Sequence, residues 1–297
     1  MRLLTYEREG APRLGLLLQE RVVDLADATI GALPESMQAF IEAGAPALER
    51  ARELIDSLSA GADALARASM PAADVQLLAP IPRPPRNIVC VGLNYAEHAA
   101  ESRSTQGVPE HPVYFAKPAG TVIGPGAEIP LHAHVSRRID WEAELVVVIG
   151  RGGRDIPEDE ALERVFGYTV GNDITARDLQ RRHQQWYKGK GLDGFCPLGP
   201  HIVTRDELPD PQNLHISLRV NGETKQDAHT GEMVFGVAKL IAVLSLGMTL
   251  EPGDLLMTGT PSGVGFARKP PEYLQAGDVV EAEIDGIGLL RNRMAQA

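Results

Sequence analysis

Cysteine is scarce in this sequence: only Cys90 and Cys196 occur, and they lie far apart. No cysteine spacing typical of a metal site is present and no disulfide framework is implied, which favours a reducing compartment. Basic residues are outnumbered as well, because 29 Lys and Arg against 40 Asp and Glu give a formal net charge of -11. This balance argues against a nucleic-acid partner.

Long hydrophobic runs are also missing. The longest apolar runs are too short to span a bilayer, and the first residues lack the apolar core of a signal peptide. We therefore expect a soluble, cytoplasmic protein without a membrane partner. Neither a G-x-G-x-x-G motif after a strand nor a P-loop occurs, so a nucleotide cofactor is not expected.

Two parts of the chain differ in their patterning. Residues 1–80 combine strand-like alternation up to residue 25 with helical periodicity over residues 35–70, broken at residues 44–46, which predicts a small α+β module. The proline-rich segment 80–86 interrupts regular structure and marks the predicted boundary. Residues 81–297 contain many short β-like runs, which predict a mainly antiparallel β domain and an α+β, mainly β fold overall.

Few helices are predicted in the second part, over residues 96–102, 159–163, 175–186 and 234–246. The dipeptide Asn221-Gly222 between two β-like runs predicts a tight hairpin turn.

The most distinctive stretch is residues 140–149, in which alternating acids precede a β-branched run. The run predicts a strand, whose successive side chains point to opposite faces, so Asp140, Glu142 and Glu144 would share one face. Two interpretations stay open. The acids are either hydrated at a strand end, or they form a site for a hard divalent cation, which takes oxygen ligands.

Asp173 follows a predicted strand and precedes a predicted helix whose start, Thr175 to Asp178, has capping-box spacing. Alone, Asp173 would be a local cap. Together with Glu142 and Glu144 it would form a set of three carboxylates, which leaves three octahedral positions of Mg²⁺ free for water and substrate.

Two further groups of polar residues have helical spacing. His98 and Glu101 lie three residues apart and could hydrogen-bond, which leaves one imidazole nitrogen free as a base on water; the alternative is a surface His–Glu pair. Arg177 and Gln180 share this spacing, and Lys190 follows in a glycine-broken loop. These cations would suit an anionic substrate such as a carboxylic acid, or they belong to a solvated basic face.

Residues 258–265 form a glycine-rich turn after a predicted strand. Such a turn either offers backbone N–H groups and a hydroxyl to an anion or is only a turn. Ser262 lacks the G-x-S-x-G context of a nucleophile.

Taken in order, these blocks resemble the fumarylacetoacetate hydrolase family. The resemblance is carried by residues 92–95 with His98 and Glu101, and by residues 115–118, 140–145, 172–178, 189–191 with 195–197, and 258–265. It covers roughly residues 85–293, and residues 1–80 resemble the variable N-terminal module of the longer members.

This resemblance implies the family's mixed β-sandwich roll, a divalent metal (Mg²⁺, with Mn²⁺ or Ca²⁺ as alternatives) and a homodimer as the usual assembly. It also implies small 2-oxo carboxylic acids as substrates. The family's reactions on them are C–C hydrolysis of acylpyruvates, and isomerisation or decarboxylation of hydroxymuconate-type compounds of aromatic catabolism.

The resemblance also carries site residues over, position by position. The implied metal ligands are Glu142, Glu144 and Asp173. The implied catalytic residues are His98 and Glu101, which activate water, and Lys190, which stabilises negative charge. The implied substrate-binding residues are Arg177, Gln180 and Thr260, with Lys190 also in contact. Gly191 departs from the family, in which many members have serine after the lysine, and we expect this to alter the pocket rather than the chemistry.

Because both halves of the His–Glu pair are present, the first expectation is a hydrolase that cleaves a C–C bond in a 2,4-dioxo acid. His98 would take a proton from the attacking water, and the cation would stabilise the enolate charge. An isomerase or decarboxylase on the same metal site is the alternative, because it needs the same enolate without attacking water. A non-catalytic small-acid-binding protein is the alternative outside the enzymes. A glycosidase is excluded, because carboxylates on one strand face cannot flank a glycosidic bond.

Overall fold

Strand β11 (Ala143–Ile149) lies at the centre of the computed structural model, which describes residues 1–60, 62–101 and 108–296. All of its residues are buried; Leu145 and Val147 belong to one hydrophobic cluster and Val146 and Val148 to another. A strand alternates its side chains between two faces, so a continuous apolar run indicates that both faces are covered. The predicted strand is confirmed over Ala143–Ile149, but Asp140 belongs to a separate short strand, β10 (Ile139–Asp140), and therefore does not share a strand face with Glu144.

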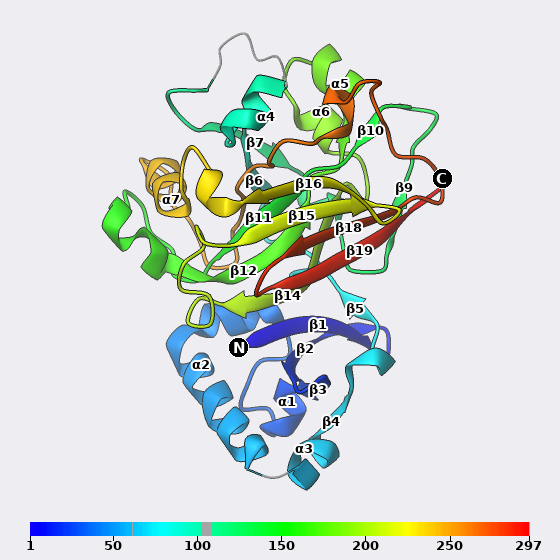
Figure 1. The fold of residues 1–297 in the computed structure, drawn as a ribbon. Coiled ribbons are helices and arrows are strands. Elements are labelled where there is room, and N and C mark those ends of the chain that lie inside the picture. Colours follow the sequence, from blue (N-terminus) through cyan, green and yellow to red (C-terminus); the bar gives the residue numbers. More distant parts are fainter. Residues whose placement is uncertain (61, 102–107, 297) are drawn as a thin grey trace.

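Twelve of the described strands form one long sheet that continues from the N-terminal part into the rest of the chain (Figure 1). In spatial order its path is β4 (Ser69–Pro71), β3 (Arg21–Asp24), β2 (Ala11–Leu18), β1 (Arg2–Arg8), β14 (Cys196–Thr204), β12 (Val165–Asn172), β11, β17 (Leu255–Met257), β6 (Ile88–Gly92) and β7 (Val113–Lys117). Two short strands lie off this path, β5 (Leu77–Leu78) beside β1 and β8 (Val122–Ile123) beside β14. Since β1 pairs with β14, the sheet crosses the boundary proposed between residues 1–80 and 81–297, and that division stays a prediction.

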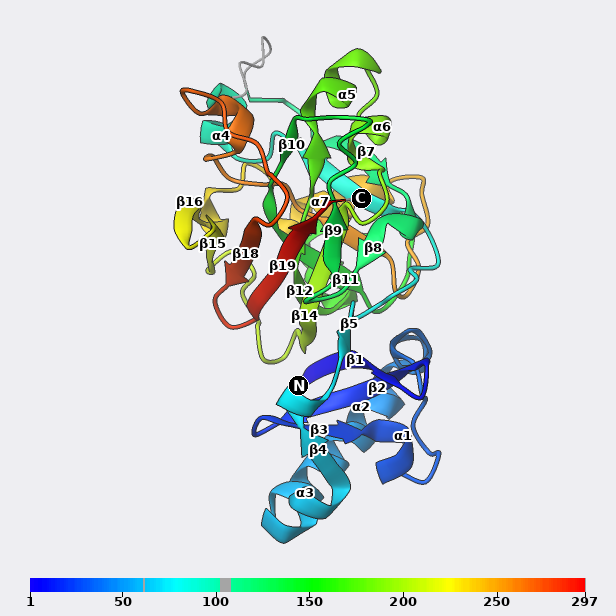
Figure 2. The ribbon, with the colours of Figure 1, turned by 90° about the vertical axis from the view of Figure 1, so that its right-hand side faces the viewer.

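A second sheet of five strands packs against β11, β12 and β14 (Figure 2). Its order is β16 (Glu223–His229), β15 (His215–Val220), β18 (Val279–Ile284), β19 (Gly288–Ala295) and β9 (Glu128–Pro130). Leu145 and Val147 lie in the same cluster as Ile216 and Ile284 of this sheet, which makes the interior of a sandwich. The strand-rich α+β fold is therefore confirmed, and most of its strand pairs are antiparallel.

The predicted hairpin turn is also confirmed. Asn221 and Gly222 join β15 to β16, and both have positive φ values, 52° and 81°. Two consecutive positive φ values define the type I′ turn, whose twist matches that of antiparallel strands.

The described residues form seven α-helices. They are α1 (Leu25–Ala28), α2 (Met37–Ser59), α3 (Ala62–Ala68), α4 (Ala96–Glu101), α5 (Arg177–Arg182), α6 (Tyr187–Lys190) and α7 (Val237–Ser245). Gly44 interrupts α2 with a φ of 63°, close to Pro46, which confirms the predicted break. Helix α4 is confirmed up to Glu101, and Ser102 lies outside the described residues. None of the helices in the described ranges is both long and apolar enough to cross a membrane.

Two helix predictions need correction. The helix predicted over residues 175–186 is wrong at both ends: Thr175 begins β13 (Thr175–Ala176), which pairs with β10 (Ile139–Asp140), and α5 ends before His183. The predicted capping box is wrong as well, because the Thr175 hydroxyl donates to the carbonyl of Asp173 (2.8 Å). The predicted α-helix over residues 159–163 is part of a 3₁₀ helix, Glu158–Arg164.

Helices α4, α5 and α6 gather at the end of the molecule away from the N-terminal part (Figures 1 and 2). At this end β11 begins and β12 finishes, with Ala143 opposite Asn172 in the antiparallel register. Glu142 immediately precedes β11 and Asp173 immediately follows β12. The Asp173 N–H donates to the carbonyl of Glu142 (2.8 Å). Strand register thus brings two acids together that are distant in sequence.

Gly171 tests how tightly this end of the sheet is packed. It lies opposite Glu144, and a Cβ there would be 2.6 Å from Val146 Cγ2 and 2.8 Å from Met257 Cε. Gly171→Ala is therefore expected to lower the free energy of unfolding by about 1–3 kcal/mol through overpacking. Gly120→Ala is the matched control, because a Cβ at Gly120 meets no atom within 4 Å. Urea unfolding of both variants measures the difference, and equal stability would contradict the close packing.

Candidate active site

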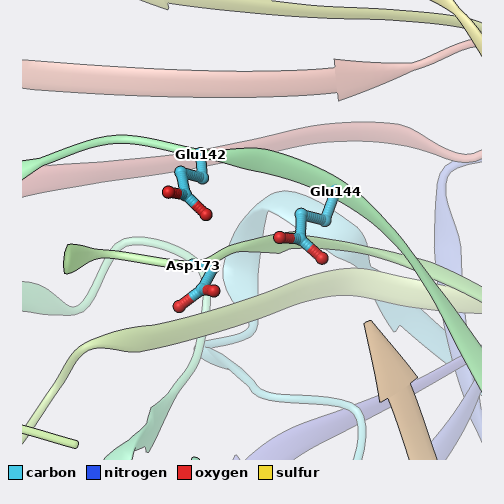
Figure 3. A group of neighbouring side chains, drawn as sticks. All are labelled: Glu142, Glu144 and Asp173. Carbon is cyan, nitrogen blue, oxygen red and sulfur yellow. The ribbon is translucent and has the colours of Figure 1, made fainter. Parts of the chain in front are cut away.

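Three carboxylates meet where β11 begins and β12 ends. One ligand oxygen from each of Glu142, Glu144 and Asp173 lies within 4.8 Å of the others, and the carboxyl groups point toward a common space (Figure 3). All three residues are buried, with exposed fractions of 4%, 1% and 0%. Hydrated acids at a strand end would be exposed, so burial excludes that interpretation.

Two buried lysines neutralise part of this charge. Lys190 Nζ donates to Glu142 Oε2 (2.7 Å) and Asp173 Oδ2 (2.5 Å). Lys117 Nζ donates to Asp173 Oδ1 (2.6 Å) and to the backbone carbonyl of Lys190 (2.5 Å). Lys117 was missed as a site residue, because a lysine in a short strand carries no pattern of its own. Its place in the family-like block 115–118 was the available signal.

Arg177 connects the trio to a fourth acid. Its Nε donates to Asp140 Oδ2 (2.7 Å), and its Nη1 lies 2.7 Å from Glu142 Oε1. Asp140 also accepts the N–H groups of Gly265 (2.7 Å) and Phe266 (3.0 Å). Asp140 therefore anchors Arg177 and a loop, and it stays outside the group of three ligand candidates.

The charges of this buried cluster do not balance. It contains four carboxylates, on Asp140, Glu142, Glu144 and Asp173, and three cations, on Lys117, Arg177 and Lys190. Burial opposes ionisation of Glu142, but Lys190 and Arg177 outweigh it and lower the pKa of Glu142 to about 2. Burial, followed by the charges of Asp173 and Glu142, raises the pKa of Glu144 well above its usual value.

A divalent cation fits this group of three. The donors are carboxylate oxygens, which hard cations such as Mg²⁺ and Mn²⁺ prefer, and one of the carboxylates lacks a compensating charge. Glu142, Glu144 and Asp173 are the residues that would hold the ion.

The glycine-rich segment 258–265 donates backbone N–H groups to anions, and these anions belong to the protein. Gly259 donates to Glu144 Oε2 (2.8 Å), and Gly263 donates to both carboxylate oxygens of Glu101 (3.1 and 3.0 Å). The segment therefore ties the carboxylate cluster to α4.

His98 and Glu101 form the expected pair on α4. His98 Nδ1 lies 2.9 Å from Glu101 Oε1, and only 6% of His98 is exposed, which rules out a surface pair. Nε2 makes no hydrogen bond to any residue that the structure describes. An imidazole held through one nitrogen can act as a base through the other.

A cavity of about 400 Å³ collects most of the predicted site residues. Its lining comprises Val91, Gly92, Leu93, His98, Phe115, Glu142, Arg177, Gln180, Arg181, Gln184, Trp186, Lys190, Thr260 and Phe266. Glu101, Glu144 and Asp173 are not in contact with it. The volume lies within the range of sites for small molecules.

Two of the predicted substrate-binding residues, Thr260 and Gln180, make hydrogen bonds to other residues of the protein. The Thr260 hydroxyl donates to the carbonyl of Ala143 (2.9 Å) and accepts from Gln226 Nε2 (2.7 Å). Gln180 Oε1 accepts from Arg177 Nη1 (3.3 Å). Gln226 was missed because β16 shows no local sign of its contact with Thr260.

Gly191 lies outside the cavity lining. A Cβ there would lie 2.6 Å from the carbonyl oxygen of Tyr187 and 3.0 Å from Pro118 Cδ. The glycine allows this close approach, and its departure from the family pattern affects the end of α6 rather than the cavity wall.

The fold and site together define a strand-rich α+β protein with a buried carboxylate centre beside a His–Glu pair. The family model described as "Fumarylacetoacetate (FAA) hydrolase C-terminal" matches residues 87–295, and the chain belongs to this family. The family expected from the sequence is thereby confirmed.

Curated relatives align over almost the whole chain. The oxaloacetate tautomerase YisK of Bacillus subtilis (strain 168) is 41% identical over 99% of this chain and 100% of its own length. The mitochondrial oxaloacetate tautomerase fahd2 of Xenopus laevis is 44% identical over 98% of this chain and 89% of its own length.

Solved structures of the family have the same architecture. A fumarylacetoacetate hydrolase from Exiguobacterium antarcticum has a TM-score of 0.84 and 39% identity, with all of both chains covered. The 2-hydroxyhepta-2,4-diene-1,7-dioate isomerase of Mycobacterium marinum has a TM-score of 0.74 and 32% identity, covering 100% of this chain and 98% of its own. The maleylpyruvate hydrolase of Sphingobium sp. SYK-6, in complex with manganese(II) and pyruvate, has a TM-score of 0.78 and 30% identity over all of both chains.

The raised pKa of Glu144 predicts that metal binding releases protons. Below this pKa the free protein carries a proton on Glu144, which a cation must displace, so metal affinity should rise with pH. Titration calorimetry with MnCl₂ in two buffers of different ionisation enthalpy measures the release. Glu144→Gln should bind the metal more weakly and without buffer dependence. A buffer-independent enthalpy in the unaltered protein would contradict the assignment.

Proposed function

We propose that the protein is a metal-dependent tautomerase that interconverts the keto and enol forms of oxaloacetate, with Mg²⁺ as its metal. The observation that carries the proposal is that His98 and the Glu142–Lys190–Arg177 cluster line one cavity. Two relatives named as oxaloacetate tautomerases support it, because they align over 98–99% of this chain.

Tautomerisation moves one proton. The C3–H bond of oxaloacetate breaks, the electron pair forms the C2–C3 double bond, and the 2-oxo oxygen takes up a proton. A cation held by Glu142, Glu144 and Asp173 would supply Lewis acidity toward the 2-oxo group. The protein's own residues must then remove the C3 proton and stabilise the negative charge that develops.

His98 is the base in this proposal. Among the titratable groups of the described lining, Glu142 is a poor base, since Lys190 and Arg177 lower its pKa to about 2 against the effect of burial. Burial lowers the pKa of Lys190, but Asp173 and Glu142 outweigh it and raise the pKa above the usual value, so this ammonium stays charged. His98 Nε2 takes the C3 proton, and Glu101 stabilises the resulting imidazolium through Nδ1. The imidazolium then gives up this proton as the enolate oxygen is protonated, which completes the enol and restores the base.

Lys190 and Arg177 stabilise the developing charge. The Lys190 ammonium lies in the cavity wall next to Glu142. In this proposal the enolate oxygen binds beside this ammonium, whose charge stabilises it. Arg177 Nη2 is buried and has no hydrogen-bond partner among the residues described, so it remains available to a carboxylate of the substrate.

The first assay follows the ultraviolet absorbance of enol-oxaloacetate as it relaxes to the keto form. With Mg²⁺ the protein should accelerate relaxation beyond the rate of Mg²⁺ alone, EDTA should remove this acceleration, and added Mg²⁺ should restore it. Relaxation at the rate of the metal-containing buffer would contradict a tautomerase.

His98→Ala tests the assignment of the base. Loss of a positioned general base is expected to lower kcat/KM by about 10²- to 10⁴-fold, with metal affinity unchanged. His215→Ala is the matched control, because His215 pairs with Asp227 on the exposed surface of the second sheet. Near-normal tautomerisation by His98→Ala would rule His98 out as the base.

Hydrolysis of an acylpyruvate is the second candidate. The hydrogen-bonded His98–Glu101 pair favours it, because the same Nε2 could activate water. It ranks second because the relatives named as oxaloacetate tautomerases are 41% and 44% identical to this chain, whereas the two reported proteins named as hydrolases are 39% and 30% identical. Pyruvate release from acetylpyruvate or fumarylpyruvate, without acceleration of oxaloacetate tautomerisation, would favour the hydrolase. Carbon dioxide release from oxaloacetate would indicate a decarboxylase, and binding without turnover a non-catalytic protein.

A further inference from the structure

Helix α5 presents a second arginine to the cavity. Arg177, Gln180 and Arg181 line it at spacings of three and four residues from Arg177, which places them on one side of the helix, and Gln184 lines it from beyond the end of α5. Arg177 is buried and Arg181 is exposed, so this row leads from the carboxylate cluster to the mouth of the cavity.

The cations of the lining differ in whether their charge is compensated. Lys190 is paired with Glu142 and Asp173, and Arg177 is paired with Asp140 and Glu142. Arg181 makes neither an ion pair nor a hydrogen bond with a residue in the described ranges. Arg181 is therefore the lining cation whose charge the rest of the described protein leaves uncompensated.

Phe266 holds this free charge near the inner arginine. The guanidinium carbon of Arg177 lies 4.4 Å from the centroid of the Phe266 ring, and that of Arg181 lies 5.6 Å from the same centroid. Stacking on an aromatic ring positions a guanidinium without using its N–H donors. Arg181 can thus donate to a ligand that already occupies the inner end of the cavity.

We propose that Arg181 binds the distal carboxylate of the substrate and makes the site selective for 2-oxo dicarboxylic acids over 2-oxo monocarboxylic acids. The inference deepens the proposed tautomerase, on which its kinetic test rests. A 2-oxo monoacid would engage the inner end, with Lys190 and Arg177, and would leave Arg181 without a partner. A diacid supplies the missing counter-charge, and guanidinium–carboxylate pairing is both strong and directional.

The kinetic test compares two substrates that differ only at the distal position. Oxaloacetate carries a carboxylate where 2-oxobutanoate carries a methyl group, and enolisation of 2-oxobutanoate is followed by NMR as hydrogen–deuterium exchange at C3. In Arg181→Gln the ratio of kcat/KM for oxaloacetate to that for 2-oxobutanoate should fall about fivefold to tenfold, chiefly through KM, as expected for a partly solvated charge pair. Arg181→Lys should keep part of the preference, since it retains the charge.

Arg182→Gln is the matched control, because Arg182 follows on the same helix, is exposed and does not line the cavity. Its ratio should stay within twofold of that of the unaltered protein. A ratio that is unchanged in Arg181→Gln would overturn the proposal. A ratio that Arg182→Gln lowers as much as Arg181→Gln does would overturn it as well, because it would indicate that the overall positive charge of the helix, and not a contact with Arg181, sets the preference.

A binding measurement separates this proposal from the proposed reaction. Calorimetry with the Mg²⁺-loaded protein compares L-malate with 2-hydroxybutanoate, a pair that differs at the same position and cannot enolise. If the unaltered protein turns over neither oxo acid, the tautomerase is wrong, but a preference for malate that Arg181→Gln loses still supports the dicarboxylate site. Equal affinity for both hydroxy acids, or no binding of either, would overturn it.

Discussion

The ammonium group of Lys190 lies between the carboxylates of Glu142 and Asp173, 2.7 and 2.5 Å from their oxygens, and all three residues are buried. Removing charges from water costs several kcal/mol per ion, so acids buried this deeply need cations, backbone donors or a metal beside them. The chain supplies these from β7, α5, α6 and the segment 258–265. Charge compensation therefore determines which elements must meet at the end of β11.

The glycine-rich segment relates the two chemical halves of the site to each other. Gly259 donates to the carboxylate of Glu144 and Gly263 to that of Glu101, so one short stretch of backbone holds the carboxylate cluster and the His98–Glu101 pair together. Backbone donors have no side-chain rotamers, and their positions are fixed once the surrounding strands have formed. The distance between base and cluster is thus a property of the fold.

The same constellation can serve several reactions, because tautomerisation, decarboxylation and C–C hydrolysis of 2-oxo acids all develop charge on an enolate. The similar proteins bear this range of names, from tautomerase and isomerase to hydrolase. Selection among substrates must then come from other groups that line the cavity. Arg181 and the aromatic pair Phe115 and Trp186, whose ring centroids lie 5.1 Å apart, are the groups that this chain places there.

Local signals in the sequence determined strand β11, the turn at Asn221 and Gly222, and the three acids whose order resembles that of the family. Each of these depends on residues a few positions apart, where alternation and turn chemistry act directly. Tertiary structure alone decided that Lys117 pairs with Asp173, 56 residues away, and that Gln226 accepts the N–H of Ala143, 83 residues away. It also decided that Thr175 belongs to a strand rather than to a helix, because Thr175 pairs with Asp140 of β10, and no residue near Thr175 in the sequence indicates this pairing. Contacts between distant segments leave no periodic pattern in the sequence, because they form only when the sheets pack together.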